Sequence, residues 1–148
     1  MLIFTHCDSE ILEIQDCLAL EAEARSRPHL GSKDQPLYLN SGEPCYLRLP
    51  RGTVLKPGEC ITTEIRDSSA RIVAKPESIL TVTASHPEGL LKAAYHLGNR
   101  HVPLEITLTY LRLFPDPVLQ KMLEQMGLMV TREVAPFFPE LGAYHNHQ

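Results

Sequence analysis

Two segments with the same pattern constrain the fold most. Residues 85–99 read SHPEGLLKAAYHLGN, and residues 115–127 read PDPVLQKMLEQMG. In each, a residue able to cap, such as Asp116 in the second, precedes a proline that suits the first helical turn. Helically spaced apolar residues follow, and Gly98 and Gly127 are natural stops. The sequence therefore predicts two amphipathic helices, whose apolar stripes are Leu90, Leu91, Ala94 and Tyr95, and Val118, Leu119, Met122, Leu123 and Met126.

Strand-like segments flank these helices. ILTVTA precedes the first, HVPLEITL (residues 101–108) and TYLRLF lie between them, and LMVTREV follows the second. The order β-α-β-β-α-β is that of the split βαβ, or ferredoxin-like, arrangement. Right-handed crossovers then lay both helices on one face of a four-stranded antiparallel sheet, leaving the other face and the edges open for a partner. We expect this domain to span residues 76–148, with a flexible C-terminal tail.

The first half of the chain has a different pattern. Residues 1–75 alternate short strand-like pieces, such as CYLRLP and CITTEI, with turn clusters such as PRG and KPGE. This predicts a small all-β domain and an α+β fold class overall. For residues 16–27, the sequence is compatible with either a helix or a strand.

Composition and charge exclude several classes of function. A net charge of -4 and a pI near 5.9 argue against binding nucleic acid or anionic membranes. The chain has no apolar run of membrane-spanning length and no secretory signal, so we expect it in the cytoplasm. Its four cysteines stand singly and are expected to be bystanders. Common catalytic motifs are absent, so nothing indicates an enzyme.

His101 follows the first predicted helix, with only Asn99 and Glu105 as further candidate ligands within four residues. A structural histidine at the start of a strand, bonded to backbone, is the simpler interpretation, because an isolated histidine is weak motif evidence. A metal ligand is the alternative, since a helix C-terminus favours a cation and imidazole suits Zn, Cu and Ni. One ring cannot hold such an ion, so the other ligands must come from a two-fold-related chain or from His145 and His147.

Several segments resemble the UreE family of urease accessory proteins. AAYHLGNRHVPLEI, DPVLQKMLEQMGLMV and FFPELGAY are similar to its C-terminal domain, and LPRGTVLKPGE and IVAKPESILTV are similar to its N-terminal half. The resemblance implies a homodimeric nickel metallochaperone that delivers Ni(II) to the urease apoprotein together with other urease accessory proteins. It also implies an N-terminal β domain that resembles peptide-binding modules.

The resemblance assigns site residues as well. The histidine of the family's GNRH motif falls on His101 and implies a metal ligand at the dimer interface, one ring from each subunit. His145 and His147 match C-terminal histidines that add ligands from a mobile tail. Zn(II) suits the same donors, so a Ni(II) preference comes from the resemblance alone. The chain stops at HNHQ and has Pro115-Asp116-Pro117 where some members carry histidines, so few ions per dimer are expected. An adaptor in the urease maturation complex, with an incidental metal site, is the alternative function.

Overall fold

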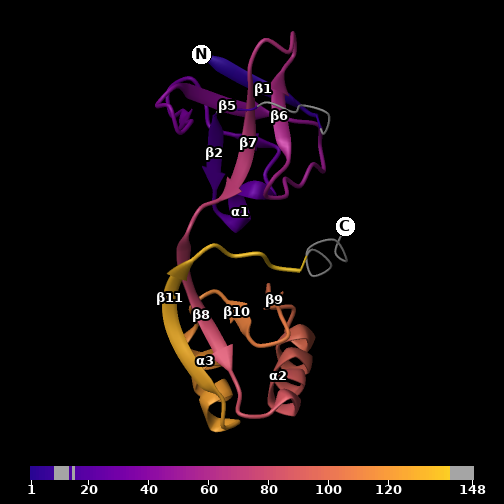
Figure 1. Cartoon of the computed structure of the whole chain (residues 1–148), viewed down its shortest axis with the longest axis vertical. Helices are drawn as coiled ribbons and strands as arrows, with labels where there is room; N and C mark the ends of the chain where they lie inside the picture. The colour runs from indigo at the N-terminus through magenta and orange to yellow at the C-terminus, as the bar shows by residue number, and fades with distance from the viewer. Residues whose placement is uncertain (9–13, 15, 141–148) are drawn as a thin grey trace. The chain divides into compact units, whose positions relative to one another are not determined.

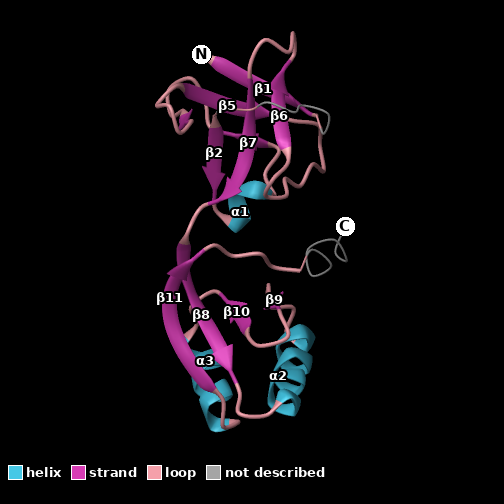
Figure 2. Ribbon diagram, in the orientation of Figure 1, coloured by secondary structure: helices cyan, strands magenta, loops and turns pink. Residues whose placement is uncertain are grey.

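The computed structural model describes residues 1–8, 14 and 16–140. The chain divides into two compact units, Met1–Lys75 and Pro76–Gln148. Figures 1 and 2 show the elements of both. No helix in the described part of the chain is long and apolar enough to cross a membrane.

The first unit is a strand-rich body with one short helix. In the described residues, seven strands form one sheet in the order β2-β7-β6-β1-β5-β3, with β4 paired to β5. Residues 16–27, left open from the sequence, form a strand and then a helix of four residues, so this unit is not purely β. The elements are β1 (Leu2–Cys7), β2 (Cys17–Leu20), α1 (Ala22–Arg25), β3 (His29–Leu30), β4 (Leu37–Tyr38), β5 (Pro44–Arg48), β6 (Cys60–Thr63) and β7 (Ser69–Ala74).

Alternation of apolar residues explains the core of this unit. In β5, Cys45 and Leu47 are fully buried, while the residues that alternate with them are only partly buried. Side chains of a strand point alternately to opposite faces, so one face of β5 contributes to the core. The same holds for β7, where Ala70 and Ile72 are the buried residues. These side chains pack with Phe4, Leu18, Leu20, Leu39, Leu49, Leu55 and Ile61 in one cluster.

The second unit has the element order predicted from its sequence. Its strands form an antiparallel sheet in the order β11-β8-β10-β9, with β9 at one edge. Leu80 and Val82 of β8 lie in one core cluster with side chains of both helices. Both helices therefore cover the same face of the sheet. The elements are β8 (Glu77–Thr83), α2 (Pro87–Asn99), β9 (Glu105–Ile106), β10 (Leu111–Leu113), α3 (Pro117–Gln125) and β11 (Met129–Ala135).

The opposite face of this sheet, expected to stay open, is partly covered by the chain itself. After β11, residues 136–140, which we call the tail root, run past β8 and β10 toward β9 (Figure 1). Phe137 is fully buried, and its ring meets that of Phe114 edge to face, with centroids 4.8 Å apart. Ile79, on the same face, is also fully buried. The tail root is therefore a packed part of the second unit.

Candidate metal centre

His101 lies in the turn that ends α2. Its N–H donates to the carbonyl of Gly98 at 3.0 Å, and the N–H of Val102 donates to the carbonyl of Leu97 at 3.2 Å. With Arg100 as the C-cap, this is the Schellman pattern of paired bonds. His101 holds the position after the cap, where the backbone turns left-handed, with φ at 56°. The residue is therefore part of a helix end, and the predicted strand start at His101 is wrong.

The end of α3 shows which residue usually occupies the position after the C-cap. There the N–H of Gly127 donates to Glu124 and the N–H of Leu128 donates to Leu123, at 3.0 and 3.1 Å. Gly127 takes the left-handed turn, with φ at 86°, as predicted. Glycine does this without the penalty that a Cβ brings, which is about 1–2 kcal/mol for other residues. At the end of α2, a histidine occupies the position that a glycine occupies at the end of α3.

The predicted stop at Gly98 is wrong because core packing sets the helix end. Gly98 lies inside α2, one residue before its last residue Asn99. Leu97 is fully buried, and Val102 packs against the same core cluster. A contact between these two positions typically accompanies a Schellman end, so it fixes the left-handed residue at His101.

The surroundings of His101 suit a cation. The residue is exposed, and the last carbonyls of α2 give that end of the helix a partial negative charge. Within the described residues, however, no group of three or more His, Cys, Asp or Glu side chains could hold a metal ion. A metal ion bound by His101 would therefore need further ligands from outside the described part of one chain.

The end of the tail root, Glu140, lies close to the residues that follow this helix end. The N–H of Glu140 donates to the carbonyl of Leu104 at 2.8 Å, and Leu104 is three residues after His101. His145 and His147 lie outside the described residues. His145 is five residues beyond Glu140, and a fully extended chain of that length spans at most about 18 Å.

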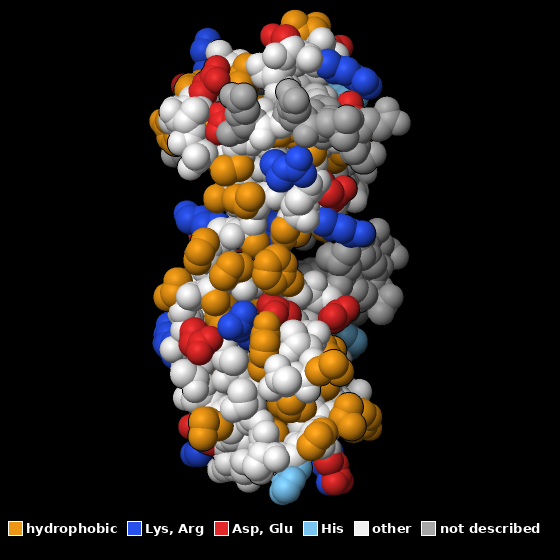
Figure 3. Space-filling model, in the orientation of Figure 1, with side chains coloured by type: hydrophobic (Ala, Val, Ile, Leu, Met, Phe, Trp, Pro, Cys, Tyr) orange, Lys and Arg blue, Asp and Glu red, His pale blue; other side chains and the backbone are white. Residues whose placement is uncertain are grey.

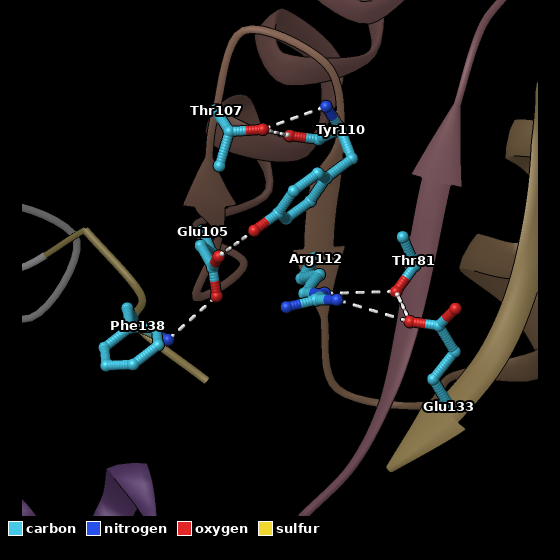
Figure 4. A network of polar contacts seen from close by, with 7 residues as sticks. All are labelled: Thr81, Glu105, Thr107, Tyr110, Arg112, Glu133 and Phe138. Carbon is cyan, nitrogen blue, oxygen red and sulfur yellow. Dashed lines mark hydrogen bonds and ion pairs between the residues drawn. The ribbon is translucent and has the colours of Figure 1, made fainter. Parts of the chain in front are cut away.

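A polar network holds the tail root on the sheet (Figure 4). Glu105, a buried residue of β9, accepts a hydrogen bond from the N–H of Phe138 at 2.9 Å. Its other oxygen accepts from the hydroxyl of Tyr110 at 3.1 Å. Burial, and then the charge of Glu105, raise the pKa of the Tyr110 phenol above its ordinary value, so the phenol stays protonated and donates at neutral pH. The sequence identified Glu105 only as a candidate ligand beside His101, whereas the structure uses both carboxylate oxygens internally.

Part of the outer side of α2 is apolar. Half of the predicted stripe is exposed, since Leu91 is 71% exposed and Tyr95 is 66% exposed. Ile106 and Leu108 are exposed as well, at 49% and 98%. We call these four side chains the α2 face. Leu91, Ile106 and Leu108 line a hollow of about 380 Å³ with neighbouring residues, and hydrophobic side chains gather over α2 in Figure 3. Large apolar groups exposed together indicate a surface that another molecule covers.

Among the described residues, the other histidines and the cysteines do not form a group that could hold a metal ion. His86 takes the N-cap position of α2, and the His96 ring packs edge to face on Tyr95 at 5.3 Å. All four cysteines are free thiols. Burial, together with the charges of Asp16 and Glu43, raises the pKa of Cys45 to about 11. A thiol of that pKa stays protonated at neutral pH and is a poor metal ligand.

Comparison with known proteins identifies the family. Residues 77–148 match the family described as "UreE urease accessory protein, C-terminal domain". A protein of Nostoc sp. named urease accessory protein UreE is 52% identical over 130 residues, which cover 88% of this chain and 84% of the relative. One of Thermosynechococcus vestitus with the same name is 54% identical over 134 residues, covering 88% and 87%. One of Burkholderia lata is 44% identical over 133 residues, covering 88% and 61%. With this identity over most of its length, the chain belongs to the UreE family of urease accessory proteins.

Proposed function

We propose that this protein is a metallochaperone that carries Ni(II) as a homodimer and releases it for urease active-site assembly. The observation that supports this most is the exposed imidazole of His101, held in a left-handed turn at the negative end of α2. Non-glycine residues in such backbone conformations are concentrated at functional sites, because the strain needs a compensating role. The relatives' name, urease accessory protein, indicates that urease is the recipient of the ion.

Sharing the ion between two chains follows from the ligand count. One imidazole leaves at least three positions of a four-coordinate ion unfilled. A two-fold axis beside His101 adds the same ring from a second copy. His145 and His147 of each chain supply the remaining donors. All of these donors are imidazoles, which suit Ni(II) and also Zn(II).

The α2 face is the surface on which the second copy docks. It runs along the same helix that ends at His101, so a copy covering Leu91 and Tyr95 brings its own α2 alongside. In an isologous interface the same patch meets itself, which suits an apolar face without a matching charge pattern. The α2 face thus accounts for both the exposed apolar residues and the missing metal ligands.

The ligand set also suits transfer of the ion. Ligands on a tail can detach one at a time, so the site opens more easily than a closed structural zinc site of four cysteines. In the proposed cycle, the tail histidines bind the ion during transport. They dissociate from it first when the ion is delivered. The four free thiols agree with a reducing cytoplasm as the compartment.

A crystal grown with nickel tests this function. Anomalous scattering at the nickel edge is expected to show one peak between two copies of His101 related by a two-fold axis. A strong peak elsewhere, with none between these rings, overturns the shared site.

Removal of residues 144–148 is expected to weaken nickel binding or to lower the number of ions bound, because it deletes both tail histidines. The dimer is expected to remain, since the α2 face is intact. Calorimetric titration and sedimentation measure the two effects. Titration curves that superimpose for the shortened and complete chains contradict a role for the tail.

A further inference from the structure

We infer that the outer face of the sheet in the first unit binds a segment of a partner protein that carries both acidic and apolar side chains. The residues of this face are directly paired across neighbouring strands and point away from the core. We call them the β5 face, and the pairs are Ile3 with Tyr46, His29 with Arg48, and Tyr38 with Pro44. The inference goes beyond the carrier function and does not depend on it.

The strand register determines which side chains share this face. Successive side chains of a strand point to opposite sides, and the residues of β5 that alternate with Tyr46 and Arg48 are fully buried in the core. Tyr46 and Arg48 therefore point outward. Directly paired residues of adjacent strands lie on the same side of a sheet, so Ile3 of β1 and His29 of β3 lie beside them.

One part of the β5 face is apolar and exposed. Tyr38 is 63% exposed and Ile3 is 38% exposed. Tyr46 is half-buried, and the guanidinium of Arg48 lies over its ring, 4.7 Å from the centroid. Tyrosine and arginine are enriched in protein interfaces, where they account for much of the binding energy. Their combination on one sheet face indicates a surface that binds another protein.

The other part of the face is basic. Arg48 and His29 form one of its pairs, and Arg27 and Arg51 are exposed a few residues away along the chain. Within the described residues, none of these four side chains forms an ion pair with a carboxylate. Arg48 spends one N–H group on the carbonyl of Leu47, and its guanidinium has five such donors. Since none of the paired positions of the β5 face is acidic, the face is complementary to carboxylates.

Charge favours a partner protein over a second copy of this chain. In a two-fold dimer the same patch meets itself, so the guanidinium and imidazole groups of both copies would gather at one surface. An acidic segment meets no such repulsion. Residues of β5 that point the same way are about 6.6–6.8 Å apart, which is also the spacing of alternate side chains in an extended peptide. An extended segment along β5 can therefore place a carboxylate at Arg48 and apolar side chains near Tyr46 and Tyr38.

Peptide binding to the complete, metal-free chain tests the inference. The probe is a short synthetic peptide with two glutamates at one end and phenylalanine and leucine at alternate positions toward the other, made in both sequence orders. We expect one order to bind and to shift the amide NMR signals of β1, β3 and β5. Replacement of its glutamates by lysines, or a salt concentration of about 0.5 M, is expected to weaken binding at least about tenfold.

Variants of the protein test the two parts of the face separately. Arg48→Glu is expected to weaken binding of the glutamate peptide at least about tenfold and to strengthen that of the lysine peptide. Tyr38→Ala is expected to weaken both by about tenfold. Lys121→Glu is the matched control, because it makes the same change of charge at an exposed position of α3. Should Arg48→Glu not fold, His29→Glu reverses the local charge at its exposed neighbour.

Several results would overturn the inference. They are amide shifts centred on other strands, no binding of either peptide order up to about 1 mM, and equal binding by Lys121→Glu and the charge variants of the face. Loss of the dimer in Tyr38→Ala assigns the face to a second copy instead. Tighter binding of a short single-stranded DNA assigns it to nucleic acid, whose phosphates and bases also suit arginine and tyrosine. Nickel titrations of the same variants are expected to match the wild type, so a failure of the carrier function leaves this inference standing.

Discussion

Replacement of His101 by glycine is expected to lower nickel affinity at least about 100-fold without destabilising the fold. In the proposed dimer, the substitution removes both imidazoles of the shared site at once. Loss of a residue that only orients a metal ligand typically costs 10–100-fold, so loss of the ligand itself costs more. The left-handed turn, with φ at 56°, is meanwhile one that glycine adopts freely.

The stability of His101→Gly tests whether the backbone at this position is strained. Relief of the left-handed strain contributes about 1–2 kcal/mol, and the greater freedom of glycine in the unfolded chain offsets about 0.5–1 kcal/mol. The free energy of unfolding is therefore expected to stay unchanged or to rise by up to about 1.5 kcal/mol, measured by urea denaturation of the metal-free protein. His101→Ala removes the ring but keeps the strain, so its affinity should match that of His101→Gly without the gain in stability.

His96→Ala is the matched control, since His96 lies in the last turn of the same helix and forms no part of the proposed site. It is expected to bind nickel like the wild type. Unchanged calorimetric titration of His101→Gly means that the carrier mechanism is wrong. A loss of more than about 1 kcal/mol in stability means that the side chain of His101 serves the fold, contrary to the Schellman interpretation.

The order of elements in the second unit could be predicted because local patterns determine it. Asp116 accepts from the N–H groups of Val118 and Leu119 at 2.9 and 3.0 Å, and Gly127 ends α3, as the residue types suggest. The end of α2 could not be placed from the same rules. Gly98 is an acceptable stop by local preference, but burial of Leu97 and packing of Val102 set the left-handed turn three residues later, at His101.

That shift also explains the short β9. The strand predicted from His101 starts at Glu105, because the helix turn uses residues 101–102 and Pro103 has no N–H to pair with a neighbour. The histidine could be identified as a candidate ligand from its motif. Its left-handed conformation, which distinguishes it from an ordinary surface histidine, is visible only in the structure.

The hydrogen bond between Glu105 and the tail root could not be predicted from local sequence patterns either. Glu105 and Phe138 are 33 residues apart, and their bond joins an edge strand to a segment that reads as a loop. The signal available in the sequence was a single acidic residue among apolar neighbours in a short strand. An acidic residue there usually faces solvent. In the folded unit it is buried, and its carboxylate accepts hydrogen bonds from Tyr110 and from the backbone of Phe138 in the tail root.

Substitution of Leu91 by aspartate is expected to separate the dimer and, with it, to abolish tight nickel binding. Leu91 is 71% exposed in one chain, and in a two-fold dimer the change occurs twice. Losing the burial of a leucine costs about 1.5–3 kcal/mol, so two copies cost about 3 kcal/mol or more, which weakens association over a hundredfold. The added charges, facing each other across a dry surface, weaken it further. Leu108→Asp is expected to act in the same way.

Val118→Asp is the matched control, because Val118 is 77% exposed on α3, away from the α2 face. It introduces the same charge in place of an exposed apolar residue. The mass of the dimer in solution and its nickel affinity should both stay unchanged. Sedimentation gives the mass, and calorimetry on the same samples gives the nickel affinity. If Leu91→Asp and Leu108→Asp stay dimeric with wild-type titrations, the interface lies elsewhere. If they become monomers that still bind nickel with wild-type affinity, His101 does not need a second imidazole, and an ion shared between two chains is excluded.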